Sequence, residues 1–71
     1  MSENFASPKW FRVGIATDPQ PNDKIYDELH QAIDRAKRMY DAHSYDTPVA
    51  VWDEQHVIVY LFVCGQQFRN V

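Results

Sequence analysis

Residues 57–64, Val-Ile-Val-Tyr-Leu-Phe-Val-Cys, form the most strand-like stretch of this chain. β-Branched and aromatic side chains favour strands, and no charged or amide side chain interrupts them here, so both faces of the strand are apolar. A strand that is apolar on both faces is typical of the interior of a sheet. We therefore expect residues 57–64 to form the central strand of the fold.

Two other stretches indicate strands. Residues 10–16 alternate, with Phe11, Val13 and Ile15 on one face, and this period of two is typical of a strand. Residues 49–52, Val-Ala-Val-Trp, form a short strand. The four residues that separate it from the central strand predict an antiparallel hairpin, with a loop built around a type I turn.

The segment between the first two strands, residues 23–43, predicts one long helix. Its apolar residues recur at steps of three and four along one stripe, which consists of Ile25, Leu29, Ala32, Ile33, Ala36 and Tyr40. Asn22 or Asp23 is suited to cap the N-terminus, because a short side-chain oxygen accepts from the free amides there. Asp34 and Arg38 lie four residues apart with the acid first, which favours an ion pair.

The order of strand, helix, strand and strand predicts a two-layer α+β fold, β-α-β-β, with one helix packed on one face of a three-stranded antiparallel sheet. With residues 57–64 in the middle, the strands have the spatial order 1-3-2. The length of 71 residues fits one domain, which we expect over residues 9–71. Residues 1–8 show little periodicity and are expected to form a flexible N-terminal arm.

Composition limits the location and the partners of the protein. Cys64 is the only cysteine, which favours a reducing cytoplasm, and the N-terminus lacks the pattern of a signal peptide. The longest apolar run is far shorter than the ~20 residues that span a membrane. A net charge of −3 disfavours tight binding to nucleic acid. We expect a soluble cytoplasmic protein without a membrane contact.

One helix covers only one face of a sheet that is apolar on both. We expect the helix to cover the aliphatic face, because Trp and Tyr keep a polar group that suits an interface; the opposite assignment stays open. The other face then exposes more apolar surface than monomers usually do, so we expect a homodimer that joins through it. The predicted interface residues are Trp10, Trp52, Ile58, Tyr60 and Phe62. In the alternative, the chain ends with Phe5 and Phe68 fold over this face.

No motif indicates catalysis, a metal or a cofactor. The spacing of the three histidines matches no metal-binding signature. Cys64 follows an apolar strand and has no basic neighbour to activate its thiol. Asp53 and Glu54 are adjacent carboxylates in a turn, where nothing nearby prepares one of them for acid–base work. We expect a protein that is not an enzyme.

Two functions remain. The first is a non-catalytic protein-interaction module that self-associates and presents Asp46, Asp53 and Glu54 to a partner with a basic surface. The alternative is single-stranded nucleic-acid binding by base stacking on an open sheet, although the acidic charge opposes it. In size and layout the chain resembles small acidic products of phages and mobile elements. Some of those products block host enzymes by surface contact, and the resemblance implies a similar mode of action.

Overall fold

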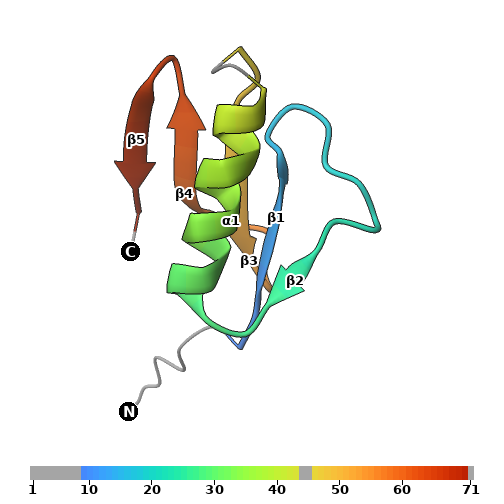
Figure 1. Ribbon diagram of the computed structural model, residues 1–71. Helices are drawn as coiled ribbons and strands as arrows, with labels where there is room; N and C mark the ends of the chain where they lie inside the picture. Colours follow the sequence, from blue (N-terminus) through green and yellow to red (C-terminus); the bar gives the residue numbers. More distant parts are fainter. Residues whose placement is uncertain (1–8, 44–45, 71) are drawn as a thin grey trace.

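The structure, a computed structural model, describes residues 9–43 and 46–70. These residues form an antiparallel sheet of five strands with one helix on one of its faces (Figure 1). The elements in chain order are β1 (Phe11–Ile15), β2 (Ile25–Tyr26), α1 (Leu29–Ala42), β3 (Val49–Asp53), β4 (Ile58–Val63) and β5 (Gln66–Arg69). The spatial order of the strands is β2-β1-β3-β4-β5. The arm predicted for residues 1–8 lies outside the described residues.

The prediction of a three-stranded sheet in the order 1-3-2 is wrong. The sheet has five strands, and the middle one is β3, in which Val49, Ala50, Val51 and Trp52 are all buried. The strongly apolar strand β4 lies next to β3 and is flanked on its other side by β5. An apolar pattern on both faces shows that a strand is interior, but it does not say which interior strand stands in the middle.

The predicted start of the helix is also wrong. Ile25 and Tyr26 pair with β1 as the short strand β2, and α1 begins only at Leu29 after Glu28, which makes no side-chain capping bond. Ile25 lies four residues before Leu29, so a strand position coincides there with a helical spacing. Ile25 pairs with Arg12 of β1, a strand distant in sequence, and this pairing favours the strand over the helix.

The helix connects two parallel strands. β1 is antiparallel to both of its neighbours, β2 and β3, so β2 and β3 run in the same direction with β1 between them. Parallel strands need a crossover connection, and α1 supplies it by passing over β1 and β3 (Figure 1). The order 1-3-2 predicted that the strands before and after the helix, residues 10–16 and 49–52, would not be neighbours, but β1 and β3 pair directly.

The helix packs on the sheet through small side chains. Ala32, Ala36 and Tyr40 are its buried residues, each four positions from the next, which confirms the middle of the predicted stripe. The two alanines let the helix backbone approach the sheet, where the valines of β1 and β3 are almost completely buried. On the solvent side, Arg38 Nε lies 3.3 Å from Asp34 Oδ2, as the sequence predicted.

The predicted antiparallel hairpin between β3 and β4 is present, but its loop has three residues, 54–56, and not the four predicted. The His56 N–H donates to the Asp53 carbonyl at 3.0 Å, and the Asp53 N–H donates to the Val57 carbonyl at 2.9 Å. The carboxylate of Asp53 accepts from the backbone N–H groups of Gln55 and Val57. His56 has a φ of 64°, as expected for the left-handed residue that closes a three-residue hairpin loop.

A second hairpin, which the sequence analysis does not predict, joins β4 to β5. Val63 pairs with Gln66, so only Cys64 and Gly65 form the loop, with φ values of 53° and 74°. Two successive positive φ values define the type I′ turn that matches the twist of paired strands. Through this turn the chain adds β5 at the edge of the sheet.

Candidate interaction surface

The register of the strands assigns each side chain to one of the two faces. Val51 lies opposite Val13 on one side and Tyr60 on the other, and Val49 lies opposite Ile15 and Phe62. Most of these residues form or border the core beneath α1. They define the covered face of the sheet, and the alternate residues define the open face, which α1 does not touch.

Two rows of side chains cross the open face. The first row contains Ile25, Arg12, Trp52 and Ile58 in register. The second row contains Gly14, Ala50, Leu61 and Phe68. Arg12 is the only charged side chain in these two rows, and the second row is apolar from Ala50 on β3 to Phe68 on β5.

The open face gathers most of the exposed hydrophobic surface. Four large hydrophobic side chains among the described residues are exposed, and three of them, Ile25 (47%), Ile58 (38%) and Phe68 (50%), lie on this face. The fourth, Val57 (46%), lies at the hairpin turn opposite Asp53, in the row of Phe11 on the covered face. Single exposed hydrophobic residues are ordinary, but their concentration on one face indicates an interaction site.

Arg12 carries the positive charge of this face. Its guanidinium carbon lies 5.8 Å from the ring centroid of Trp10, within the range of a cation–π contact. Its Nε atom is buried and has no hydrogen-bond partner among the described residues. Trp and Arg are the residue types that contribute most to binding energy at protein interfaces, and here they stand together beside the apolar rows.

Gly14 leaves room for a loop residue on the open face. A Cβ atom at Gly14 would stand 2.3 Å from the Asp23 carboxylate oxygen, closer than atoms approach. That carboxylate accepts a hydrogen bond of 2.9 Å from the Gln20 N–H, so it organises the loop between β1 and β2. The absence of a side chain at Gly14 therefore fixes how this loop lies against the sheet.

The structure separates the five predicted interface residues. Trp52 and Ile58 lie together on the open face, and Trp10 stands beside them through its contact with Arg12. Tyr60 and Phe62 lie on the covered face, where the Phe62 ring is 5.7 Å from that of Tyr40 and only 3% exposed. Their predicted face is wrong because a β-bulge at Val59 and the pairing with β3 set the register of β4.

The predicted acidic contact residues do not form one surface. Asp53 uses its carboxylate within its own turn, and Glu54 accepts a hydrogen bond of 2.5 Å from the Lys9 N–H. Asp46 is exposed but precedes β3, whereas Asp53 ends it, so the length of that strand separates them. Contact of all three residues with one basic partner stays a prediction, and the three do not share one surface of the molecule.

The sequence analysis did not place Ile25, Leu61 and Phe68 on the open face, where Ile25 and Phe68 are exposed and Leu61 is partly buried. Ile25 fitted the helical stripe, Leu61 is one of the aliphatic residues expected beneath the helix, and Phe68 was considered only in a chain end that folds over this face. One signal was present for Phe68. Glycine as the second of two residues between strand-like stretches is typical of a type I′ hairpin, and Cys64-Gly65 has that form.

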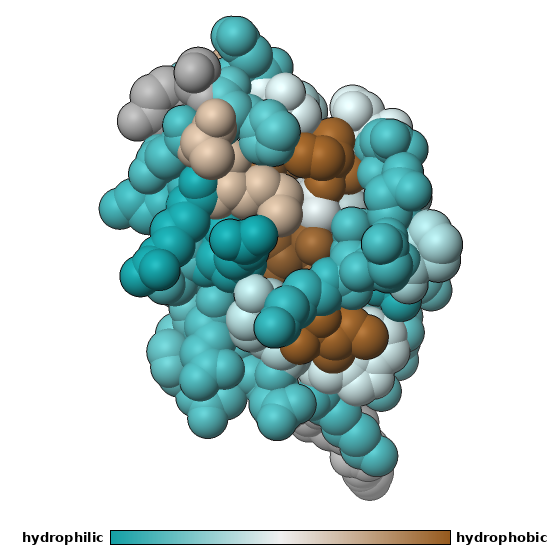
Figure 2. Space-filling view, turned by 45° about the vertical axis from the view of Figure 1, so that its right-hand side comes forward, coloured by the Kyte–Doolittle hydropathy of each residue, from teal (hydrophilic) through white to brown (hydrophobic). Residues whose placement is uncertain are grey.

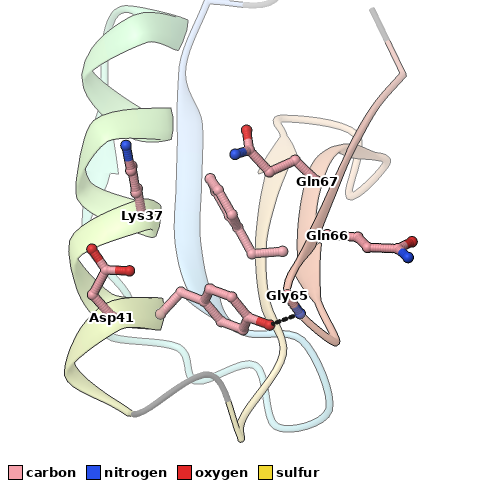
Figure 3. A pocket seen from close by; sticks show the side chains of 7 residues that line it. Lys37, Asp41, Gly65, Gln66 and Gln67 are labelled. Carbon is pink, nitrogen blue, oxygen red and sulfur yellow. Dashed lines mark hydrogen bonds between the residues drawn. The ribbon is translucent and has the colours of Figure 1, made fainter.

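A small cleft opens on the covered side, where α1 leaves β4 and β5 partly bare. It has a volume of about 160 Å³ and lies between Lys37 and Asp41 on the helix and Gln67 on β5. Tyr40 also lines the cleft, and its hydroxyl accepts a hydrogen bond of 2.6 Å from the N–H of Gly65, which Figure 3 labels in the turn before β5. This bond ties the β4–β5 turn to the helix.

Hydrophobic side chains also reach the surface on another side of the molecule. Figure 2 shows hydrophobic patches in the middle of this side, framed by hydrophilic residues. The core is bordered by partly buried side chains, among them Ile15, Leu29 and Ile33. A domain of this size buries only about 60% of the surface of its unfolded chain, so such partial exposure beside the core is expected.

Titratable side chains that could bind a metal do not gather. Within residues 9–43 and 46–70, no group of three or more His, Cys, Asp or Glu side chains is close enough to hold a metal ion. His30 Nδ1 lies 3.2 Å from Glu28, and Cys64 is exposed in its turn. In the same part of the chain, no helix has the length and apolarity to cross a membrane.

Comparisons with known proteins give no further guide. No protein-family model, no curated protein and no solved structure matches this chain. The resemblance to phage and mobile-element products depended on a strand-helix-strand-strand order, which the structure replaces with two further strands. The arguments on function therefore depend on the surface of the molecule itself.

Proposed function

We propose that the protein is a non-catalytic interaction module that self-associates through the open face of its sheet. The observation that supports this is the position of Ile25, Ile58 and Phe68, which are exposed on the one face that no helix covers. Aromatic side chains alone bury about 150–250 Å² each. Phe68 is the aromatic one of these three residues and is half exposed, and the gathering of all three on one face, rather than the size of a continuous patch, indicates an interaction site.

A second copy of the chain fits this face as its partner. Sheets pack face to face about 10 Å apart with their apolar sides together, and a two-fold axis places the same patch on both sides of the contact. A contact centred on Ile58 and Leu61 keeps the two Arg12 side chains apart, because they lie two strands away on β1. No Asp or Glu belongs to the two rows, so the acidic residues that give the net charge of −3 lie outside a contact centred on these two residues.

Light scattering over a concentration series tests the proposal. We expect the wild-type mass to rise from one chain to two or more, and Ile58→Ser to shift this transition to higher concentration by about tenfold, since a truncated interface anchor costs more than 1 kcal/mol. Val57→Ser is the matched control, because Val57 is similarly exposed but lies opposite Asp53 on the other side. A monomeric wild type at millimolar concentration, or equal effects of both variants, would contradict the proposal.

The same protein samples test the nucleic-acid alternative. Binding of single strands needs several cations along the backbone as well as aromatic rings, and Arg12 is the only charged side chain in the two rows of the open face. We expect no change in tryptophan fluorescence when a thymidine oligonucleotide is added. Quenching that weakens as salt is raised would favour the alternative.

A further inference from the structure

The two edges of the sheet differ in how well they are protected. β2 has only two residues and follows a loop with Pro19 and Pro21. Short strands with nearby prolines are a usual protection against pairing with another chain. β5 has four residues, Gln66 to Arg69, all exposed, and it contains no proline and a single charge. The β5 edge is thus open to a further strand.

The turn before β5 determines which backbone groups point outward. In a two-residue hairpin the residues beside the loop form a hydrogen-bonded pair, and such pairs recur at every second position. Val63–Gln66 is therefore hydrogen-bonded, and the bond of 2.9 Å from the Asn70 N–H to the Val59 carbonyl fits the same series. The N–H and C=O groups of Gln67 and Arg69 consequently point away from β4.

Only one two-fold register uses all of these outward groups. With the axis at Phe68, Gln67 lies opposite Arg69 of the second copy on both sides, which gives four backbone hydrogen bonds. With the axis at Arg69, two like charges lie directly opposite each other, which destabilises paired strands. With the axis at Gln67, Arg69 meets Gly65 of the second copy, whose N–H already bonds the Tyr40 hydroxyl.

We propose that two copies of this chain join edge to edge through β5, in antiparallel pairing with Phe68 on the two-fold axis. Phe68 then forms a pair without direct hydrogen bonds, in which side chains are closest, and its ring, half exposed in one chain, packs on the second Phe68. Leu61 lies next to Phe68 on the open face, so the pairing extends the apolar surface of one copy into that of the other. This contact goes beyond the proposed function, because it uses backbone groups at the edge.

Proline at position 67 tests the edge contact. Gln67→Pro removes an outward N–H that the bond to β4 does not use, so each chain should keep its fold while the dimer loses two hydrogen bonds. We expect the dissociation constant from sedimentation equilibrium to rise about thirtyfold. Gln67→Ala keeps the N–H and should leave the constant unchanged. Unaltered association of Gln67→Pro would overturn the edge contact.

The Ile58→Ser variant distinguishes the edge contact through β5 from the open-face contact of the proposed function. Dissociation by Gln67→Pro but not by Ile58→Ser supports the edge and contradicts the open-face contact. The reverse result contradicts the edge contact alone, and a monomeric wild type contradicts both.

A cysteine cross-link provides a measurement that survives if Gln67→Pro does not fold. In a Cys64→Ser background, Phe68→Cys places two thiols across the axis, where the Cα atoms are about 4.5 Å apart, within the range of a disulfide. We expect rapid formation of a covalent dimer under mild oxidation. The control, Gln66→Cys in the same background, lies opposite residue 70 of the second copy and should cross-link far more slowly. Equal rates for the two variants would overturn the proposed register.

Discussion

The covered and the open face of this sheet are built from the same strands but contain different kinds of side chain. The covered face is filled by valines, Phe11 and Phe62 beneath two helix alanines and Tyr40, and its central members are almost completely buried. The open face has small residues, Gly14 and Ala50, at its centre and exposed hydrophobic residues around them. One face thus stabilises the fold, whereas the other leaves apolar surface for a partner.

The largest expected difference between the two faces comes from truncating one phenylalanine on each of them. Phe62→Ala removes a buried ring that contacts Tyr40 and should cost about 3–5 kcal/mol of unfolding free energy. Phe68→Ala removes a half-exposed ring and should cost about 1 kcal/mol or less at dilutions where the chain is monomeric. Urea unfolding followed by tryptophan fluorescence measures both. Similar costs would contradict the assignment of the two faces.

The turn that adds β5 at the edge of the sheet should be the next most sensitive position. Gly65→Ala places a Cβ at a φ of 74°, where nothing crowds it, so the cost of about 1–2 kcal/mol is purely one of backbone conformation. Cys64→Asn should instead stabilise the hairpin by a few tenths of a kcal/mol, because Asn-Gly is the preferred type I′ pair. Thermal unfolding of the two variants should therefore move in opposite directions.

The close contact at the centre of the open face is expected to have a smaller effect. Gly14→Ala pushes the Asp23 carboxylate away from the Gln20 N–H and should cost about 1 kcal/mol, the usual value of one hydrogen bond. In an Asp23→Ala background the clash is absent, and Gly14→Ala should then be neutral or stabilising. A double-mutant cycle measures this coupling. Additive effects of the two substitutions would show that Asp23 does not restrict position 14.

The smallest expected effect lies on the solvent side of the helix, away from both sheet faces. Arg38→Ala breaks the ion pair with Asp34, whose side chains are both mostly exposed. Solvent and salt screen such a pair, so we expect a loss of about 0.3–0.5 kcal/mol that falls further in 1 M salt. Urea unfolding at two salt concentrations measures it. A loss above 1 kcal/mol would indicate that Arg38 also supports the sheet.

The local patterns along the chain predicted much of the secondary structure. The strands at residues 10–16, 49–52 and 57–64, the hairpin turn after Asp53 and the helical stripe through Ala36 are all present. Each of these features depends on residues close together in sequence, or on the alternation of apolar and polar side chains along one segment. β2 and β5 were not predicted, because a two-residue strand has no period and Gln66 to Arg69 has no hydrophobic alternation.

The sequence predicted an exposed apolar surface on one face of the sheet, but it did not predict correctly which residues lie there. Ile25, Ile58 and Phe68 are exposed on the face without a helix, whereas Ala50 and Trp52 on the same face are buried. Tyr60 and Phe62 were placed there wrongly, because the face of every residue in β4 depends on its register with β3. A shift of one residue exchanges the two faces of a strand, and the β-bulge at Val59 introduces such a shift.

The amino-acid sequence by itself determined that a sheet and one amphipathic helix would form, and that the apolar surface would exceed what one helix can shield. These properties follow from side-chain periodicity and size, which local sequence contains. Only the tertiary structure decided that β3 is central, that Ile25 belongs to a strand and that Phe62 lies beneath the helix. Pairing between distant strands sets these features, because the energy of a register is a sum over cross-strand contacts that no single segment contains.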